Sequence, residues 1–151
     1  NSIYGDIQFN EYGLELLQIN KAKTVSPIIG TFFGKVASPM FASYKVKNMN
    51  HWVFEGTNIK NGEEFGKVSL NHRPEEVSNG ASGWEADQIS EDSKDFIVLA
   101  KGTNLFGAAD MVFKYTDNGG WVFNASSIPF TGALFIDSVA ARIMINLLTH
   151  N

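Results

Sequence analysis

The sequence predicts a mixed α/β domain, in which a small sheet contains an antiparallel hairpin and is closed by a C-terminal helix. Three observations predict this class. A short apolar run at 96–100 has the length of a buried strand, and two alternating runs at 111–115 and 121–125 flank a glycine-rich turn. Apolar residues then recur at helical spacing after Asp137. The 151 residues are enough for one domain with its own core.

The first half of the chain gives weaker signals. Short strands are expected at 6–9 and 51–55, and residues 11–20 fit either a short helix or an irregular strand. Residues 28–46 mix aromatic side chains with Gly and Pro, which indicates aromatic-packed loops or bulged strands.

Residues 61–95 are the most acidic part of the chain, with nine acidic and three basic residues and a net charge of −6. Turn formers such as Asn61-Gly62, Arg73-Pro74 and Asn79-Gly80 interrupt this stretch. We interpret it as a loop-rich acidic insertion on the surface. A cation site built from its carboxylates is the alternative, although no regular Asp-x-Asp-x-Asp-Gly spacing is present.

The last third is clearer. The run Phe96–Ala100 is β-branched and apolar, as in a buried strand. Residues 117–120 read Asp-Asn-Gly-Gly, and Asn and Gly supply the positive φ of a tight hairpin turn. We expect the inward side chains of the hairpin to be Trp121 and Phe123, together with Met111 or Phe113.

Asp137 is expected to cap the closing helix, because an N-cap carboxylate accepts hydrogen bonds from the free amides of the first turn. Apolar residues follow at helical spacing, and others widen the stripe, so we expect the helix to be largely covered and packed on a sheet face. The residues of this stripe are Val139, Ala140, Ile143, Met144, Ile145, Leu147 and Leu148.

Composition excludes several classes of function. The net charge of −4 argues against a nucleic-acid or anionic-membrane partner. The absence of cysteine excludes disulfides, zinc–thiolate sites and a cysteine nucleophile. No apolar run approaches the ~18 residues of a membrane span. The chain starts at Asn1 without a signal peptide, so we expect a cytoplasmic protein. Residues 1–151 are either a single domain or a piece of a longer polypeptide.

Two glutamates with apolar neighbours are candidates for chemistry. Glu55 follows Trp52-Val53-Phe54, and at the end of an aromatic strand its carboxyl group would be desolvated, with the raised pKa that general acids and bases need. The alternative is an exposed strand-end carboxylate or one paired with a lysine. Glu85 follows Trp84, and its alternative is a carboxylate that binds backbone amides or an arginine inside the fold.

A metal site has little support in the sequence. His72 with Glu75 and Glu76 could be read as a ligand cluster, but loop residues of mixed charge are the simpler interpretation. The serine-hydrolase elbow Gly-x-Ser-x-Gly and the glycine-rich phosphate loops are absent. We therefore expect this chain to hold no metal and no cofactor of its own.

Five segments, in order, resemble the C-terminal region of N,N-dimethylformamidase large (beta) subunit-like proteins. They include a Trp-apolar-Phe-Glu-Gly segment, a Gly-Ala-x-Gly-aromatic-Glu-x-Asp segment, the hairpin, a Ser-Ile segment and the closing helix. The sequence departs from the family at Ser126, where the family has Gly, and at Ala141, where it has Ser. The matching residues are 51–57, 80–87, 108–123, 126–128 and 139–148.

The resemblance implies an amidohydrolase that cleaves the C–N bond of a small amide, and a fold like the end of a glutamine-amidotransferase-like domain. The family's catalytic region carries an iron held by tyrosines and a glutamate, and the His-Asp-Glu-Tyr-Trp-type segment of that site is absent here. Iron is thus expected in a preceding region, with this chain inactive alone. Its partners would be the remainder of the catalytic polypeptide or a companion subunit, and a small amide.

The resemblance also suggests roles for individual residues. Glu55 is the position that we match to a family glutamate that acts in the chemistry outside the metal shell, where it would give a proton to the departing amine. Trp52 and Glu85 are expected to contribute to binding. The alternative function is a non-enzymatic binding or structural module that presents an aromatic-rich surface to a partner.

Overall fold

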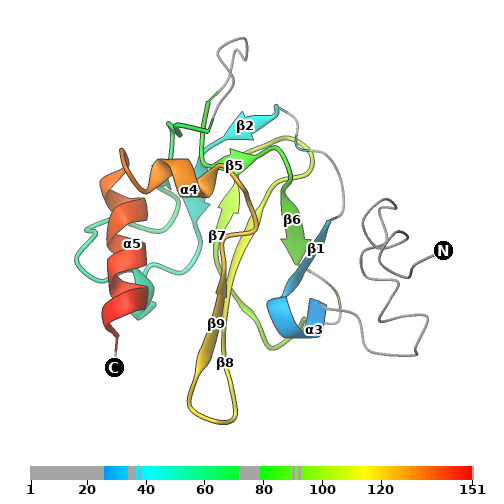
Figure 1. Cartoon of the computed structure of the whole chain (residues 1–151), viewed down its shortest axis with the longest axis vertical. Coiled ribbons are helices and arrows are strands. Elements are labelled where there is room, and N and C mark those ends of the chain that lie inside the picture. The colour runs from blue at the N-terminus through cyan, green and yellow to red at the C-terminus, as the bar shows by residue number, and fades with distance from the viewer. Residues whose placement is uncertain are drawn as a thin grey trace, which may run out of the picture.

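The computed structural model describes residues 26–33, 37, 39–71, 79–89, 91 and 93–150. Its largest element is a five-stranded antiparallel sheet with the strand order β4-β3-β7-β8-β9 (Figure 1). The strands are β4 (Glu64–Phe65), β3 (Tyr44–Val46), β7 (Ile97–Gly102), β8 (Asp110–Tyr115) and β9 (Trp121–Asn124). The predicted strand at Phe96–Ala100 corresponds to β7 and is confirmed.

Two small antiparallel sheets lie beside the large one. β1 (Thr31–Phe33) pairs with β6 (Asp87–Ile89), and β2 (Phe41–Ala42) pairs with β5 (Ser82–Gly83). The short helix α3 (Ser26–Ile29) precedes β1. The described parts of the acidic stretch 61–95 therefore contribute β4, β5 and β6, each paired with another strand.

The region 28–46 contains the end of α3 and the three short strands β1, β2 and β3. The expectation for this region was aromatic-packed loops or bulged strands, and its described residues form short strands joined by loops after the end of α3. The strand expected at 6–9 and the ambiguous segment 11–20 lie outside the described residues.

The predicted hairpin is confirmed as β8 and β9. The Thr116 amide donates to the Gly120 carbonyl (2.8 Å), and the Gly119 amide donates back to Thr116 (3.1 Å). Gly119 has φ +82°, a left-handed conformation that glycine adopts without steric cost. Phe113 lies opposite Phe123, which is half-buried against the core, so the expected facing of the hairpin holds.

The closing helix is α5 (Ser138–Thr149), and its cap is as expected. Asp137 Oδ1 accepts hydrogen bonds from the amides of Val139 (3.0 Å) and Ala140 (2.9 Å). The prediction that this helix is largely covered was wrong. Ile145 and Leu148 are 46% and 78% exposed, because α5 packs on the core through one face only. The buried side chains of that face are Ala140, Ile143 and Leu147.

The predicted strand at 51–55 was also wrong, because Trp52–Phe54 forms one turn of 3₁₀-helix, η1. The side chain of His51 caps this turn by accepting from the Val53 amide, and Gly56, with φ +73°, follows it. Val53 and Phe54 are both buried, although a strand would have pointed them to opposite faces. Three consecutive apolar residues do not distinguish a buried strand from a buried helical turn.

The main core contains residues from the five-stranded sheet, η1, α4 (Phe130–Ala133) and α5. Tyr44 is fully buried, stacked on Phe65 with ring centroids 5.6 Å apart and edge-on to Phe130 at 6.2 Å. Its hydroxyl donates to the Ala125 carbonyl. Burial raises the pKa of the Tyr44 phenol far above its usual range, so this tyrosine stays protonated inside the core.

Candidate functional site

The structure brings two of the predicted site residues together beside the end of α5. Trp52 and Glu55 line a pocket of about 180 Å³ with three α5-end residues, Asn146, Thr149 and His150. The side chain of Glu55 is exposed. We expected the Glu55 carboxylate to be desolvated at the end of a strand, but the described residues leave it in contact with solvent.

Asn146 holds the turn that carries Glu55 against α5. Its Nδ2 donates to the backbone carbonyls of Val53 (2.9 Å) and Glu55 (2.9 Å). The last carbonyls of a short helical turn have no partner within the turn, so a side-chain amide that donates to them fixes the end of the turn. The backbone of Glu55 is thereby fixed relative to α5, while its carboxylate stays at the mouth of the pocket.

Trp52 forms one wall of the pocket and connects it to the sheet. Its indole ring stacks on the His150 imidazole, with centroids 3.7 Å apart and planes 7° from parallel. The indole Nε1 donates to the hydroxyl of Tyr115 on β8 (2.8 Å). The pocket wall is thus held from both the helix end and the hairpin.

His51 lies behind this wall, and the sequence did not identify it as a candidate. Its ring packs on Phe113 with centroids 4.4 Å apart, and its buried Nε2 has no hydrogen-bond partner among the described residues. Burial, and then the charge of His150, lower the pKa of His51. The ring is therefore favoured in its neutral form near neutral pH.

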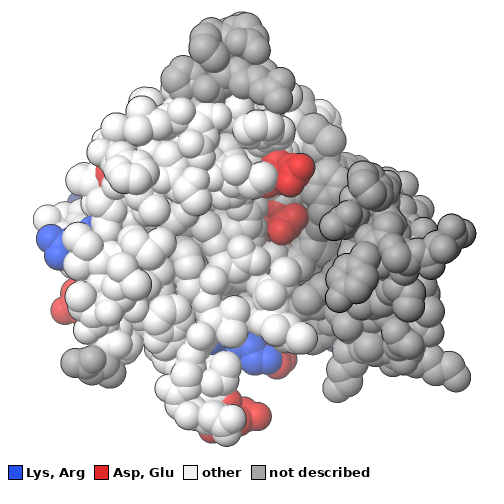
Figure 2. All heavy atoms as spheres, viewed as in Figure 1, with Lys and Arg blue, Asp and Glu red and all other residues white. Residues whose placement is uncertain are grey.

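Glu85 lies elsewhere, on the segment between β5 and β6. In Figure 1, η1 and α5 lie on one side of the large sheet, whereas β6 lies on the other side with β1. Glu85 is exposed, which contradicts the alternative of a carboxylate held inside the fold by backbone amides or an arginine. Burial, and then the charge of Glu85, raise the pKa of Asp87. The face drawn in Figure 2 shows acidic side chains near the segment between β5 and β6.

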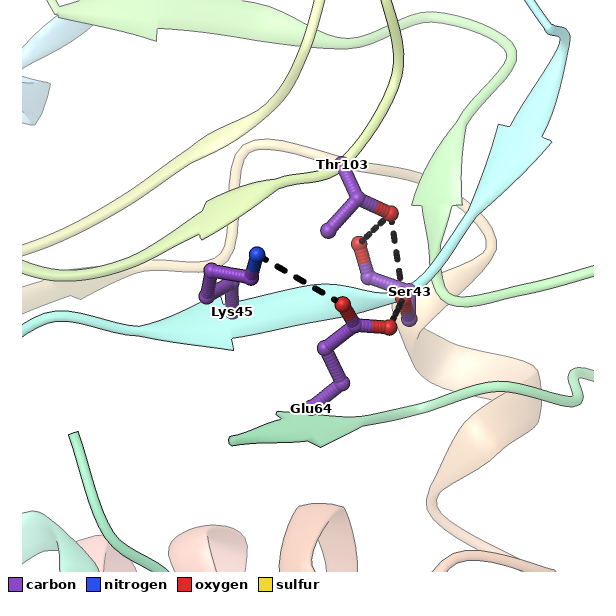
Figure 3. Close-up of polar contacts among 4 residues, drawn as sticks. All are labelled: Ser43, Lys45, Glu64 and Thr103. Atoms are coloured by element: carbon purple, nitrogen blue, oxygen red, sulfur yellow. Dashed lines mark hydrogen bonds and ion pairs between the residues drawn. The ribbon is translucent and has the colours of Figure 1, made fainter. Parts of the chain in front are cut away.

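A polar cluster formed by residues on or next to β3, β4 and β7 was not identified in the sequence (Figure 3). The Ser43 hydroxyl donates to Glu64 Oε2 (2.8 Å) and shares a hydrogen bond with the Thr103 hydroxyl (3.0 Å). Lys45 Nζ lies 3.7 Å from the other carboxylate oxygen of Glu64. These residues are separated by up to 60 positions, so only the strand pairing brings them together.

The disfavoured metal cluster of His72, Glu75 and Glu76 lies outside the described part of the chain. Within the described part, no group of three His, Cys, Asp or Glu residues is placed to hold a metal ion. None of the helices described has the length and apolar character that crossing a bilayer requires.

Sequence reasoning missed the contribution of α5 to the pocket. Asn146 and His150 are not among the candidate residues that the sequence indicated. The sequence did contain one signal for Asn146. A polar Asn beside the apolar stripe of a helix often forms a hydrogen bond with the backbone of a neighbouring segment. The partner of Asn146 could not be named without the packing of η1 on α5.

The comparison with protein families agrees with the resemblance carried by the five sequence segments. A family model described as N,N-dimethylformamidase beta subunit-like, C-terminal, matches residues 13–141. A comparison with curated proteins found no match. The matched range contains Trp52, Glu55 and Glu85, together with the complete hairpin and the capped start of α5. The chain therefore belongs to the N,N-dimethylformamidase beta subunit-like C-terminal family.

Proposed function

We propose that this chain is the C-terminal portion of an N,N-dimethylformamidase-like amidohydrolase that acts on the C–N bonds of small amides, and that it is inactive alone. The family match over residues 13–141 is the observation that carries the proposal. The family is described as the C-terminal part of a beta subunit, which suggests a partner polypeptide. A glutamine-amidotransferase-like relationship is part of the same proposal.

The pocket at the end of α5 supplies a site for part of this chemistry. At about 180 Å³ it is smaller than the ~300–1,000 Å³ typical of drug-sized ligands, which suits a small amide. In this proposal Glu55 gives a proton to the departing amine, and Trp52 offers an aromatic wall for the substrate. The exposed Glu55 would gain the necessary desolvation when a partner polypeptide covers the mouth of the pocket.

The iron implied by the family would be held by the partner polypeptide. The described tyrosines of this chain support that division, because the Tyr44 hydroxyl donates inside the core and the Tyr115 hydroxyl accepts from Trp52. Bound there, the iron would polarise the amide carbonyl as a Lewis acid. The residues of this chain would then bind the substrate, exclude water and move the proton.

The test is Glu55→Gln in the assembled enzyme. This change keeps the shape of the side chain and removes its ionisation, so we expect kcat for amide hydrolysis to fall by about 10²–10⁴-fold. Glu91→Gln is the matched control, since Glu91 is also an exposed glutamate, and it should leave kcat unchanged. Circular dichroism and the thermal unfolding midpoint of both variants show whether the fold is retained.

A second variant tests whether Glu85, and not Glu55, is the proton donor. Glu85→Gln should leave kcat near the parent value in this proposal, because Glu85 lies beside Asp87 and apart from the pocket. An unchanged kcat in E55Q together with a large loss in E85Q would overturn the role of Glu55. The proton donor would then belong to the acidic pair of Glu85 and Asp87.

A binding or structural module is the second candidate, and exposed apolar side chains favour it. Phe135, Leu105 and Phe106 are 80%, 80% and 65% exposed. The described aromatic residues between 41 and 65 are mostly in the core, so the aromatic partner surface would lie at these later positions. Under this alternative, E55Q leaves amide turnover unchanged, whereas Phe135→Asp weakens assembly with the partner polypeptide, measured by sedimentation velocity.

A further inference from the structure

Three lysines converge on one face of the large sheet. Lys45 on β3 lies directly opposite Lys101 on β7, so the two side chains project from the same face. Lys47 follows two residues after Lys45, and its amide donates to the Leu99 carbonyl of β7 (2.9 Å). Together with Gly102 and Thr103, these lysines line a pocket of about 210 Å³, which we call the lysine pocket.

This arrangement is unfavourable without an anion. Like charges directly opposite each other on neighbouring strands destabilise a sheet. Glu64 and Asp110 offset part of the repulsion, at 3.7 Å from Lys45 and 3.2 Å from Lys101. Lys47 forms no ion pair with any residue that the structure describes. Three cations against two carboxylates leave one positive charge at the lysine pocket.

The two carboxylates are fixed in place, and the ammonium groups remain accessible. Asp110 accepts the Ile89 amide (2.9 Å) with its second oxygen, and Glu64 accepts the Ser43 hydroxyl (2.8 Å). The side chains of Lys45 and Lys101 are still 44% and 46% exposed. An ammonium group carries three donor hydrogens, so each of these lysines can bind a further oxygen beside its carboxylate partner.

We propose that the lysine pocket binds a small monocarboxylate such as formate or acetate. One negative charge balances the single excess positive charge, whereas a phosphate dianion would exceed it. The two oxygens of a carboxylate can each accept from a different ammonium group, which joins the cations that otherwise repel. Thr103, which lines the pocket, shares a hydrogen bond with the Ser43 hydroxyl, and Ser43 donates to Glu64, the carboxylate that faces Lys45 (Figure 3).

The ligand class also fits the chemistry proposed above. Hydrolysis of an amide breaks the C–N bond, adds the elements of water and releases a carboxylic acid, which is a carboxylate at neutral pH, together with an amine. That connection rests on the proposed function. The binding of a carboxylate does not rest on the proposed function, because the charges and the pocket belong to the described residues of this chain.

The test is a titration of the purified full chain with sodium formate and sodium acetate, with sodium chloride added to hold the ionic strength constant. A ligand that binds only the folded state raises the unfolding midpoint with a saturable dependence on its concentration. We expect such a rise with either carboxylate and none with chloride alone. Amide nitrogen–proton NMR spectra should shift at residues 45–47 and 101–103 with the same midpoint.

Lys47→Gln is the principal variant, because Lys47 has no described ion pair to break. Loss of one charge about 4 Å from the carboxylate in water corresponds to about a fivefold weaker Kd. Lys47→Arg keeps the charge and should keep the binding. Lys94→Gln, at another exposed lysine, is the matched control and should bind as the parent chain does.

Three results would overturn the site. An equal rise with chloride would make the effect one of ionic strength, and an unchanged Kd in K47Q would place the ligand elsewhere. Saturable binding of phosphate without binding of either carboxylate would overturn the ligand class. The two proposals can fail separately. If carboxylate binding depends on Lys47 but the chain has no role in amide turnover, the site is supported and the proposed function is contradicted.

Discussion

His51 gives the fold a defined dependence on pH. Burial and the charge of His150 lower the pKa of His51 in the folded state, below the ~6.5 of the unfolded chain. The unfolded state therefore binds the proton more tightly. The contribution of His51 to stability is complete above about pH 6.5 and is lost as the pH falls through its folded-state pKa. Urea unfolding at pH 7.5 and pH 5.5 should show a lower free energy of unfolding at the acidic pH.

The variant His51→Gln isolates this effect. A glutamine side chain can still accept the Val53 amide bond that His51 Nδ1 accepts, but it does not titrate. We expect the decrease in unfolding free energy between pH 7.5 and pH 5.5 to be smaller in H51Q than in the parent chain. An identical decrease would show that other groups carry the pH dependence.

Asp137 has two structural roles at the start of α5. Besides capping the first turn, its Oδ2 accepts the Gly66 amide (2.7 Å), so it also ties the helix to the segment after β4. Loss of an N-cap costs about 0.5–2 kcal/mol, and each further amide left unsatisfied adds about 1–3 kcal/mol. We expect Asp137→Ala to lower the unfolding free energy by about 2–4 kcal/mol in urea unfolding. Asp137→Asn, which keeps an acceptor, should lose less.

At the scale of elements, the side chains of the hairpin differ in how deeply they are buried in the core. Phe113 is fully buried, whereas Phe123 opposite it is half-buried. Phe→Ala in a closed core costs about 3–5 kcal/mol, and we expect that range for Phe113→Ala and roughly half of it for Phe123→Ala. Urea unfolding of the two variants measures the ratio. Equal losses would mean that Phe123 is covered in solution as fully as Phe113.

The elements that could be predicted from the sequence are those set by neighbouring residues. The hairpin follows from alternation and the turn residues at 117–120, and α5 follows from its cap and apolar spacing. The turn at Trp52–Phe54 could not be predicted, because its shape depends on packing against α5. The candidate sites were equally hidden, since Asn146 reaches Val53 across 93 positions and Ser43 reaches Thr103 across 60.

At the scale of the whole molecule, the two polar pockets belong to different parts of one framework. The pocket of Glu55 lies where η1 meets the end of α5, and the lysine pocket lies on β3 and β7 of the large sheet. Lys101 is joined to Asp110 of β8, and Trp52 is joined to Tyr115 at the end of the same strand. β8 is therefore the element that connects both pockets to the core, and destabilising it should disturb both.

The proposed division of an active site between this chain and a partner polypeptide gives the final prediction. The described residues contain no group of three possible metal ligands, so we expect the purified chain to contain much less than one equivalent of iron or zinc by elemental analysis, and to show no amide hydrolysis. Adding the iron-bearing partner region should restore turnover, and E55Q should restore far less. One equivalent of metal in the chain alone would contradict this division and would make His72, Glu75 and Glu76 the ligands to substitute next.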